Sequence, residues 1–337
     1  MADILKTSKD GKILLGMANK SVREVVIPNG VEVIGHVAFD GCHTLENITI
    51  PNTVNLIENN AFSGCSSLQS IDIPNSVTAI GMNIFYYCES LQKVTIPNSI
   101  TTIPNNAFGV CSSLRSIDIP NTVTSLDSCA FRFCGSLRSV DIPDSVTSIG
   151  HFTFGKCYSL QSIDIPNSVT NIGDAAFFHC SSLQDIVIPN SVSFIGNETF
   201  SGCTSLQNVD IPDSVTIIGR QAFDSCNSMK YVQIPNKVNI IGKEAFCFCS
   251  SLISIDIPNN VEFIGQGAFK GCRSLEAVHI HHMDIAKCDI AQDVFEGIDF
   301  DKCTLYIPYG TRWAYRHHLA FSKFKTIVME KQDGFNR

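Results

Sequence analysis

The sequence has few charged residues and no hydrophobic run of membrane-spanning length. Asp, Glu, Lys and Arg make up 17% of the 337 residues, and the net charge is -8 at pH 7. Binding to a phosphate backbone needs a concentrated basic surface, so this acidic balance argues against a nucleic-acid partner. A membrane helix needs about 18 consecutive apolar residues. No apolar run approaches that length, and we expect no membrane insertion.

The first residues lack the apolar stretch of a secretory signal. Such a signal needs a continuous apolar segment of roughly 7–15 residues. Lys6, Lys9, Asp10 and Lys12 interrupt this part of the chain. Either the protein is not secreted by this route or the signal has already been removed, and a cytoplasmic location is compatible with the sequence.

Sequence signatures of common enzyme classes are also absent. The chain contains no G-x-S-x-G, no H-E-x-x-H, no phosphate-binding loop and no G-x-G-x-x-G. Each of these motifs places a nucleophile, a metal or a nucleotide in a defined local structure. Catalysis also needs unique side chains that are oriented in one pocket. We therefore predict a protein without enzymatic activity, cofactor or metal.

What the sequence does contain is a repeat with a step of 23 residues. The Ile-Pro dipeptide recurs at this step without insertion or deletion, and the same step is kept by a phenylalanine column, a cysteine column and a leucine column that only Met229 interrupts. The prolines are Pro28, Pro51, Pro74, Pro97, Pro120, Pro143, Pro166, Pro189, Pro212, Pro235 and Pro258. Eleven units cover residues 28–280.

One unit shows how a coil is formed. In residues 114–120, apolar Leu114, Ile117 and Ile119 alternate with polar residues, which predicts a short strand with one buried face. Pro120 has no N–H for a sheet ladder and ends the strand. A coil of this kind buries its open faces only against neighbours, so the repeats are expected to stack into a solenoid.

The second half of the unit predicts a return path. A second short apolar stretch, such as residues 146–149, is followed by a column that is Gly in eight of eleven units. A conserved spacing of Gly favours a backbone position with positive φ. The segment after it, such as residues 176–180, predicts one helical turn that leads to the next coil.

The repeat resembles the BspA-like, or Treponema-type, leucine-rich repeat. The residues that carry the resemblance are Ser-Leu-x-x-Ile-x-Ile-Pro-Asn-Ser-Val-x-x-Ile-Gly-x-x-Ala-Phe-x-x-Cys. The resemblance implies an α/β fold: a right-handed, horseshoe-like leucine-rich-repeat solenoid with a parallel sheet on its concave side, and short strands and single helical turns on its convex side. It also implies an N-terminal cap over residues 1–27, eleven repeats over 28–280, and a degenerate last coil with a C-terminal cap over 281–337.

The resemblance implies a function as well. The family is associated with bacterial and protist surface proteins that adhere to proteins of a host or a neighbouring cell, and it brings no enzymatic activity. We therefore expect a monomeric protein-interaction or adhesion module at the cell surface or secreted, with a matrix protein or a surface glycoprotein as ligand. The alternatives are a carbohydrate-binding surface and an enzyme with its site in the irregular region 281–315.

The cysteines and histidines offer disulfide and metal interpretations. Eleven of the fifteen cysteines fall in the repeat column. Stacked columns point their Cβ atoms the same way, which disfavours the disulfide dihedral, so we predict a reduced, buried column. His279, His281, His282 and Cys288 lack the paired spacing of a structural zinc site, and we predict histidines that are solvated or packed in the cap.

An acidic column is expected on the outward face of the strands. Asp118, Asp141 and Asp164 occupy three consecutive coils, and like charges about 5 Å apart repel. A basic protein partner or a calcium ion would relieve this repulsion. The alternative is a solvated face on which Arg115 and Arg138 act as partial counter-charges.

A second candidate surface is the position before each repeat cysteine. It is Gly in four units, but bulkier residues occupy it in five consecutive coils, so the core does not need this side chain. Exposed aromatic side chains that gather in a stripe indicate an interaction surface, and local packing is the alternative. The predicted partner-binding residues are Tyr86, Tyr87, Phe133, Tyr158, Phe178 and His179, together with Asp118, Asp141 and Asp164.

Overall fold

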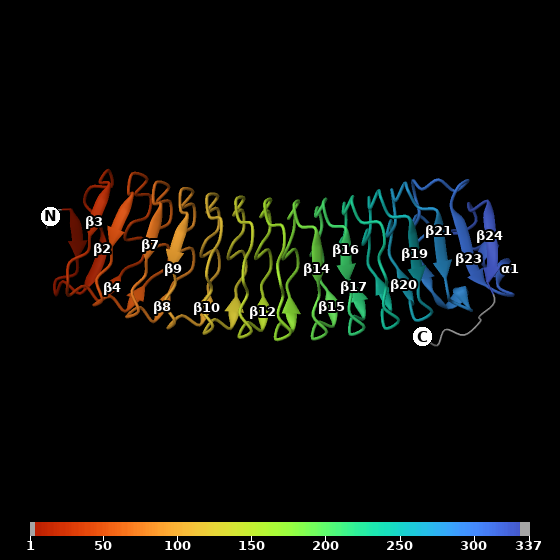
Figure 1. Cartoon of the computed structure of the whole chain (residues 1–337), viewed down its shortest axis with the longest axis horizontal. Helices are drawn as coiled ribbons and strands as arrows, with labels where there is room; N and C mark the ends of the chain where they lie inside the picture. The colour runs from red at the N-terminus through yellow and green to blue at the C-terminus, as the bar shows by residue number, and fades with distance from the viewer. Residues whose placement is uncertain (1–3, 331–337) are drawn as a thin grey trace. The chain divides into compact units, whose positions relative to one another are not determined.

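The computed structural model describes residues 4–330 as a β-solenoid that divides into two compact units, Met1–Cys180 and Ser181–Arg337. In each unit, successive coils stack in parallel with the 23-residue register that the sequence predicts (Figure 1). Residues 1–3 and 331–337, at the outer ends of the two predicted caps, lie outside the described residues. The handedness, the curvature, the caps and the segment boundaries stay predictions.

Unit 1 contains two columns of short strands. The first column holds β3 (Glu24–Val26), β5 (Asn47–Thr49), β7 (Ser70–Asp72) and β9 (Lys93–Thr95). The second column holds β4 (Val33–Ile34), β6 (Leu56–Ile57), β8 (Ala79–Ile80), β10 (Thr102–Ile103), β11 (Ser125–Leu126), β12 (Ser148–Ile149) and β13 (Asn171–Ile172). At the N-terminal end, β1 (Leu5–Thr7) pairs antiparallel with β2 (Ile13–Met17), which pairs parallel with β4.

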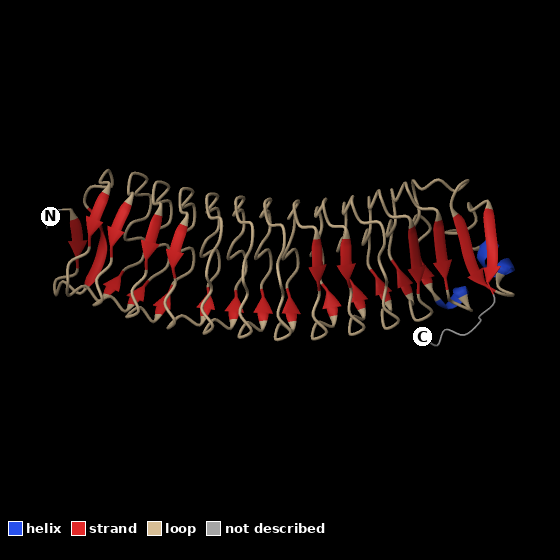
Figure 2. Ribbon diagram, viewed as in Figure 1, coloured by secondary structure: helices blue, strands red, loops and turns tan. Residues whose placement is uncertain are grey.

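Unit 2 repeats this arrangement and adds the two helices (Figure 2). Its first column holds β14 (Asp185–Val187), β16 (Asn208–Asp210), β19 (Ser254–Ile257), β21 (Ala277–Ile280), β23 (Thr304–Pro308) and β24 (Thr326–Glu330). Its second column holds β15 (Phe194–Ile195), β17 (Ile217–Ile218), β18 (Ile240–Ile241), β20 (Phe263–Ile264) and β22 (Asp289–Ile290). The 3₁₀ helix η1 (Ile285–Lys287) and the short helix α1 (Arg312–His317) lie in the irregular C-terminal region.

The first-column strand is shorter in the middle of unit 1 than the sequence predicts. In three consecutive coils it is reduced to isolated bridges between Asp118, Asp141 and Asp164. The predicted alternation holds, because Ile117 and Ile119 are buried and Asp118 between them is exposed. The pattern of apolar residues therefore predicted which side chains face the core, but overstated the length of the hydrogen-bonded strand.

Stacked phenylalanines form the centre of each unit. In unit 1 the ring of Phe131 lies 5.4 Å from that of Phe108 and 5.5 Å from that of Phe154, with nearly parallel planes. In unit 2 the rings of Phe223 and Phe246 stack at 5.2 Å. All of these rings are fully buried, so each coil buries its phenylalanine only because its neighbours do the same.

The cysteine column packs beside the phenylalanines. The thiol of Cys134 is buried and donates a hydrogen bond to the carbonyl oxygen of Phe108 at 3.1 Å, and the thiol of Cys249 in unit 2 does the same to Phe223. Burial raises the pKa of Cys134 to about 12. The prediction of a buried cysteine column is confirmed, and these thiols are protonated at neutral pH.

The return segment is a chain of turns, so the predicted helical turn is wrong. Alternate N–H groups of this segment donate to carbonyl oxygens of the next coil, as from Cys129 to His151 at 2.8 Å and from Phe131 to Thr153 at 2.9 Å. A single helical turn would leave most of its N–H groups without an intrahelical partner. The ladder between coils pairs them, and it holds Cys129 and Phe133 in the left-handed region with φ of 60° and 63°.

The glycine column serves a purpose other than the predicted one. Gly150 and its equivalents do not have positive φ. A Cβ atom at Gly150 would lie 2.6 Å from the backbone nitrogen of Ser128 in the preceding coil, which is too close for a carbon atom. Glycine is favoured there because adjacent coils approach each other closely, whereas the left-handed positions lie in the turns that follow.

Candidate functional site

Most of the predicted aromatic residues gather on the turn segments of unit 1. The rings of Tyr86 and Tyr87 meet edge to face at 4.5 Å, and Phe178 meets His179 in the same way at 4.4 Å. Tyr87 and Tyr158 are 46% and 44% exposed, so their side chains do not belong to the core. We call this surface the turn-edge patch; it consists of Tyr86, Tyr87, Arg132, Phe133, Phe152, Lys156, Tyr158, Phe178 and His179.

Two cations and one ring of the turn-edge patch were not predicted from the sequence. The ammonium group of Lys156 lies 4.6 Å from the centre of the Phe133 ring. The guanidinium group of Arg132 lies 4.9 Å from the same ring and 5.5 Å from that of Phe152. Phe152 in turn meets Phe178 edge to face at 5.5 Å. Arg132 and Phe152 therefore connect predicted residues that stand on different coils.

The backbone at the patch adopts a conformation that favours glycine. The position before the repeat cysteine has φ between 67° and 73° where it is Gly41, Gly64, Gly202 or Gly271. The same position has φ between 56° and 63° in five consecutive coils of unit 1 that carry a side chain there, namely Tyr87, Val110, Phe133, Lys156 and His179. A bulky residue in this region costs roughly 1–2 kcal/mol relative to Gly. The fold would therefore be better served by glycine.

Burial and the charge of Arg132 act in opposite directions on the ionisable groups of the patch. Burial and a hydrogen bond with Tyr87 raise the pKa of Tyr86, and the positive charge of Arg132 partly opposes this. Burial also raises the pKa of Cys129, again against the effect of Arg132. The Nε atom of Arg132 is buried without a hydrogen-bond partner. The patch thus combines aromatic rings with cationic groups.

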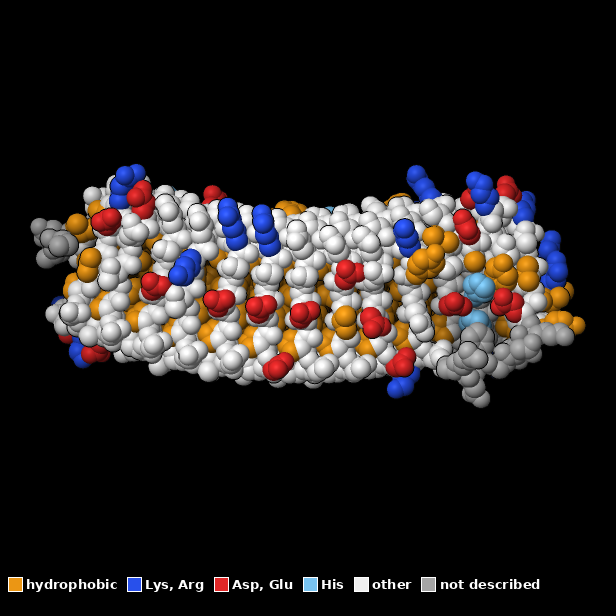
Figure 3. All heavy atoms as spheres, in the orientation of Figure 1, with side chains coloured by type: hydrophobic (Ala, Val, Ile, Leu, Met, Phe, Trp, Pro, Cys, Tyr) orange, Lys and Arg blue, Asp and Glu red, His pale blue; other side chains and the backbone are white. Residues whose placement is uncertain are grey.

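The predicted acidic column lies on the strand face of unit 1. Asp118, Asp141 and Asp164 are exposed and follow one another in register, and Figure 3 shows a row of acidic side chains across this face with basic side chains above it. Neither Arg115 nor Arg138 forms an ion pair with the three carboxylates. The predicted counter-charges are therefore too far away to pair.

The structure shows no arrangement that fits the calcium or zinc alternatives. Within residues 4–330, no three His, Cys, Asp or Glu side chains are grouped so that they could hold a metal ion. In unit 2, His281 Nε2 lies 2.9 Å from Asp256 Oδ1, and Cys288 donates to the carbonyl oxygen of Val261. The hydrogen bond from His281 lowers the pKa of Asp256. These side chains make separate contacts on different coils.

The irregular C-terminal region, where the enzyme alternative places its site, is built from structural contacts. The ring of His279 stacks on Tyr306 at 4.3 Å, and His279 Nδ1 lies 3.5 Å from Glu330. Tyr315 is buried and its hydroxyl donates to the carbonyl oxygen of His282 at 2.7 Å. Tyr315 thus fixes the chain of the preceding coil, and it offers no free group for chemistry.

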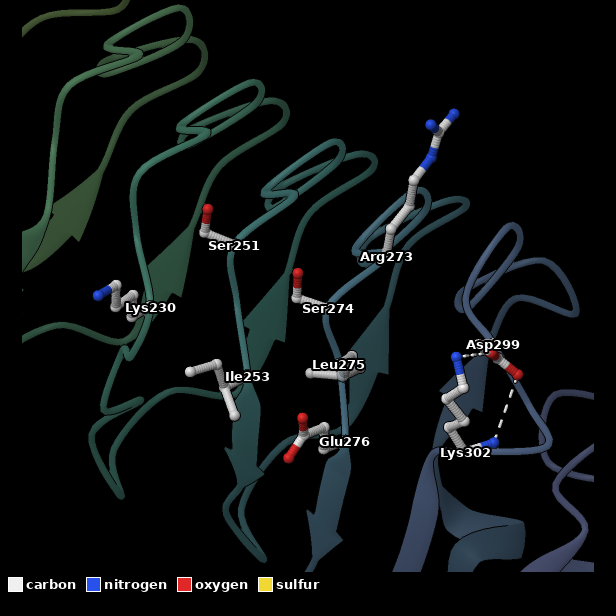
Figure 4. A pocket seen from close by; sticks show the side chains of 9 residues that line it. All are labelled: Lys230, Ser251, Ile253, Arg273, Ser274, Leu275, Glu276, Asp299 and Lys302. Carbon is white, nitrogen blue, oxygen red and sulfur yellow. Dashed lines mark hydrogen bonds and ion pairs between the residues drawn. The ribbon is translucent and has the colours of Figure 1, made fainter.

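An open cavity of about 450 Å³ lies at the edge of the unit 2 strands (Figure 4). Lys230, Arg273 and Glu276 line it together with the hydroxyls of two serines. Lys302 Nζ lies 3.3 Å from Asp299 Oδ2, and this ion pair closes one side. Ile253 and Leu275 complete the lining, which contains no buried acid or base. This is the character of a surface groove and not of a catalytic pocket.

Comparison with known proteins agrees with the columns described above. A profile of the BspA type leucine rich repeat region (6 copies) matches residues 17–134, 101–195 and 170–299. The chain belongs to this BspA-type leucine-rich-repeat family. Such repeat proteins are generally non-enzymatic, and membership supports a repeat module for protein interaction.

Solved structures of bacterial proteins share the fold. A leucine-rich repeat protein from Bacteroides ovatus is 30% identical with a TM-score of 0.76, over 97% of this chain and 90% of that chain. A leucine rich cell surface protein from Faecalibacterium prausnitzii is 27% identical with a TM-score of 0.61, over 98% and 93%. The pneumococcal vaccine antigen PcpA is 22% identical with a TM-score of 0.66, over 97% and 82%, and shows the fold alone.

No curated protein matches the sequence significantly. Among the described residues, no helix has both the length and the apolar character that a membrane span requires.

Proposed function

We propose that this BspA-type protein is a non-enzymatic adhesion module that binds a protein of a host or neighbouring cell through the turn-edge patch of unit 1. Membership in a family of repeat proteins for protein interaction supports the general class. The cell-surface name of the Faecalibacterium prausnitzii relative supports a surface location. The acidic column of Asp118, Asp141 and Asp164 would extend the contact to basic side chains of the ligand.

One observation carries the proposal. Five consecutive coils of unit 1 place a side chain at a left-handed position where four other coils have glycine and two have Ser225 and Phe248. Strained backbone positions persist in proteins where the side chain has a role outside the core. Aromatic residues and Arg are enriched in the cores of protein interfaces. The patch therefore has the composition of an interface, with large side chains at a position that glycine can fill.

A protein ligand fits this patch better than a carbohydrate. Sugars stack on open aromatic faces, but the Phe133 ring is already in contact with the cations of Lys156 and Arg132. Tyr86, Tyr87, Phe178 and His179 meet edge to face and do not form a flat platform. Cationic groups next to rings instead suit carboxylates and apolar side chains of a protein surface.

The experiment uses a variant in which the patch adopts the residue of the other coils. Tyr87→Gly, Phe133→Gly and His179→Gly together remove the side chains and relieve the left-handed backbone. The relief of roughly 1 kcal/mol per site offsets the lost ring contacts of roughly 0.5–1.5 kcal/mol each, so the melting temperature should stay within a few degrees of the wild type.

Binding is then measured on a panel of immobilised matrix proteins and surface glycoproteins, beside a glycan array. The triple variant should lose at least tenfold in affinity for the protein that the wild type binds. Tyr231→Ser is the matched control, because Tyr231 is 62% exposed but lies in unit 2 outside the patch; it should bind normally. Unchanged binding by the triple variant, or a wild type that binds glycans alone, would refute the proposal.

A further inference from the structure

Unit 2 carries an exposed apolar column in its second set of strands. The outward residues of β15, β17, β18 and β20 are Phe194, Ile217, Ile240 and Phe263, and parallel pairing places them in register on four consecutive coils. Phe194 is 40% exposed, and Ile217 and Phe263 are each 38% exposed. We call these four residues the apolar column.

Unit 1 shows that the fold does not need apolar residues at this position. The equivalent residues of β10, β11, β12 and β13 pair in the same register and are Thr102, Ser125, Ser148 and Asn171. In both units the residue that follows this position is a buried Ile or Leu. Val33, Leu56 and Ala79 occupy the same position in the earlier coils of unit 1. Since small polar residues occupy it in β10 to β13 without loss of the strand, the fold does not require the exposed hydrophobic surface of unit 2.

The apolar column has a cationic flank on one side. Arg220 and Lys243 follow Ile217 and Ile240 by three residues, and both are exposed. Each comes directly after a residue of the glycine column, where two coils lie close together. Lys243 has only a long contact of 3.8 Å with Glu244. A partner on this surface would therefore place apolar side chains on the column and carboxylates beside the two cations.

The apolar column is too small to be the interface of a dimer. Three or four partly exposed side chains offer roughly 300 Å² of apolar surface. A stable interface needs about 800 Å² from each partner. Stacking this column on its equivalent in another copy would therefore be too small to hold a dimer, whereas an area of this size is typical of a groove or stripe that takes one segment of a partner.

The spacing of the column favours a helix as that segment. Coils are about 4.8 Å apart, so four residues span about 14 Å. An amphipathic helix presents one apolar residue per turn of about 5.4 Å, which gives about 16 Å over three turns. An extended strand repeats on one face every 6.6 Å or so, which gives about 20 Å. The helix stays within about 2 Å of the column along its length, and the strand does not.

We propose that the apolar column is a second docking site, independent of the turn-edge patch, which takes a short amphipathic helix of a partner protein with acidic residues along one flank. The helix lies along the stack of coils with its apolar stripe on Phe194, Ile217, Ile240 and Phe263. Its carboxylates lie beside Arg220 and Lys243. The contact is of the helix-in-groove type, with the apolar stripe giving affinity and the flank giving orientation.

The test uses the full chain and a designed probe. The probe is a stapled helical peptide with Leu at positions i, i+4, i+7 and i+11 and Glu along one flank, and its twin carries Lys in place of Glu. Fluorescence anisotropy should show at least tenfold tighter binding of the Glu peptide than of the Lys peptide. Arg220→Glu with Lys243→Glu should reverse this preference.

The matched variant gives unit 2 the polar residues of unit 1. Phe194→Thr, Ile217→Ser, Ile240→Ser and Phe263→Asn should weaken binding of the Glu peptide at least tenfold. Because these side chains are partly buried, the melting temperature should also fall, and circular dichroism at the assay temperature shows that the variant is folded. The triple Gly variant of the turn-edge patch should bind the peptide normally. Equal binding by wild type and polar variant would overturn the proposal. So would a dimer in light scattering, or binding to anionic vesicles, that the polar variant abolishes.

Discussion

The two units share every buried column and differ in their exposed ones. The repeat phenylalanines and cysteines are fully buried in both. In unit 1, bulky residues occupy five consecutive left-handed positions and the second strand column is polar in β10 to β13. In unit 2, the same left-handed position is Gly202, Ser225, Phe248 and Gly271, and the second strand column is apolar in β15, β17, β18 and β20. The columns that build the coil are thus separate from the columns that are free to make contacts.

The largest expected effect tests whether the buried columns are equivalent in the two units. Deleting Ala130 from unit 1, or Ala222 from unit 2, shifts the following phenylalanine by one place in a ladder whose faces alternate. Each deletion should lower the free energy of unfolding by more than about 5 kcal/mol, because a buried ring and several coil-to-coil hydrogen bonds are lost together.

Removing a whole coil is the control for these deletions. Loss of residues 144–166, or of 213–235, keeps every remaining column in register, so a folded and shorter solenoid should result. Urea unfolding followed by circular dichroism measures both kinds of variant. If deleting a whole coil lowers the free energy of unfolding as much as deleting one alanine, the register of the buried columns does not determine stability.

A substitution pair in one turn separates buried from exposed columns. Phe131→Ala removes a ring from the stack and should lower the free energy of unfolding by about 3–5 kcal/mol. Phe133→Ala, two residues later, removes a half-buried ring that contacts the cations of Lys156 and Arg132 and should cost about 1 kcal/mol.

The same measurement extends this pair to unit 2. Phe223→Ala should resemble Phe131→Ala, because both rings are fully buried between two neighbouring rings. Thermal and urea unfolding measure the three variants. A cost for Phe133→Ala that equals that of Phe131→Ala would show that the turn-edge patch belongs to the core.

The smallest effect concerns pH. Burial raises the pKa of Cys134 from an ordinary 9.0 to about 12, so the folded state keeps a proton that the unfolded state loses above pH 9. The free energy of unfolding therefore does not depend on the titration of this thiol below pH 9. Between pH 9 and pH 12 it falls by about 1.4 kcal/mol per pH unit for each buried thiol.

Urea unfolding at pH 8 and pH 10 checks this slope. Cys134→Ala in unit 1 and Cys249→Ala in unit 2 should each flatten the slope by about the same amount, because burial raises the pKa of both thiols. Lysine and tyrosine also titrate in this range, and the difference between wild type and variant isolates the thiol. An unchanged slope in either variant would show that this thiol is not protected in that unit.

The sequence predicted the buried columns well because each depends on a residue type that recurs at one step. The positions of Phe131 and Cys134 in the core, and the alternation around Asp118, followed from this step alone. The sequence predicts the glycine column but not its purpose, since Gly150 is needed for the close approach of two coils and not for its φ. The distance between Gly150 and the backbone of the preceding coil cannot be deduced from the sequence of one repeat.

The surfaces were harder to predict. The aromatic residues of the turn-edge patch could be named, but Arg132 and Phe152 join them through contacts between coils that sequence spacing does not show. The residues of the apolar column can be found in the sequence, since each directly precedes one of the buried residues Ile195, Ile218, Ile241 and Ile264. The sequence does not predict that they are exposed, because a hydrophobic residue next to a core position is expected to be buried.

The sequence by itself determined the coil, because a gapless step of 23 residues leaves one way to bring identical residue types together. The tertiary structure decided what the turns do and which side chains face outward. Alternate N–H groups of each turn find their partners in the next coil, and this pairing forces left-handed backbone where a helical turn was expected. An isolated repeat has no next coil, so its sequence alone cannot reveal that choice.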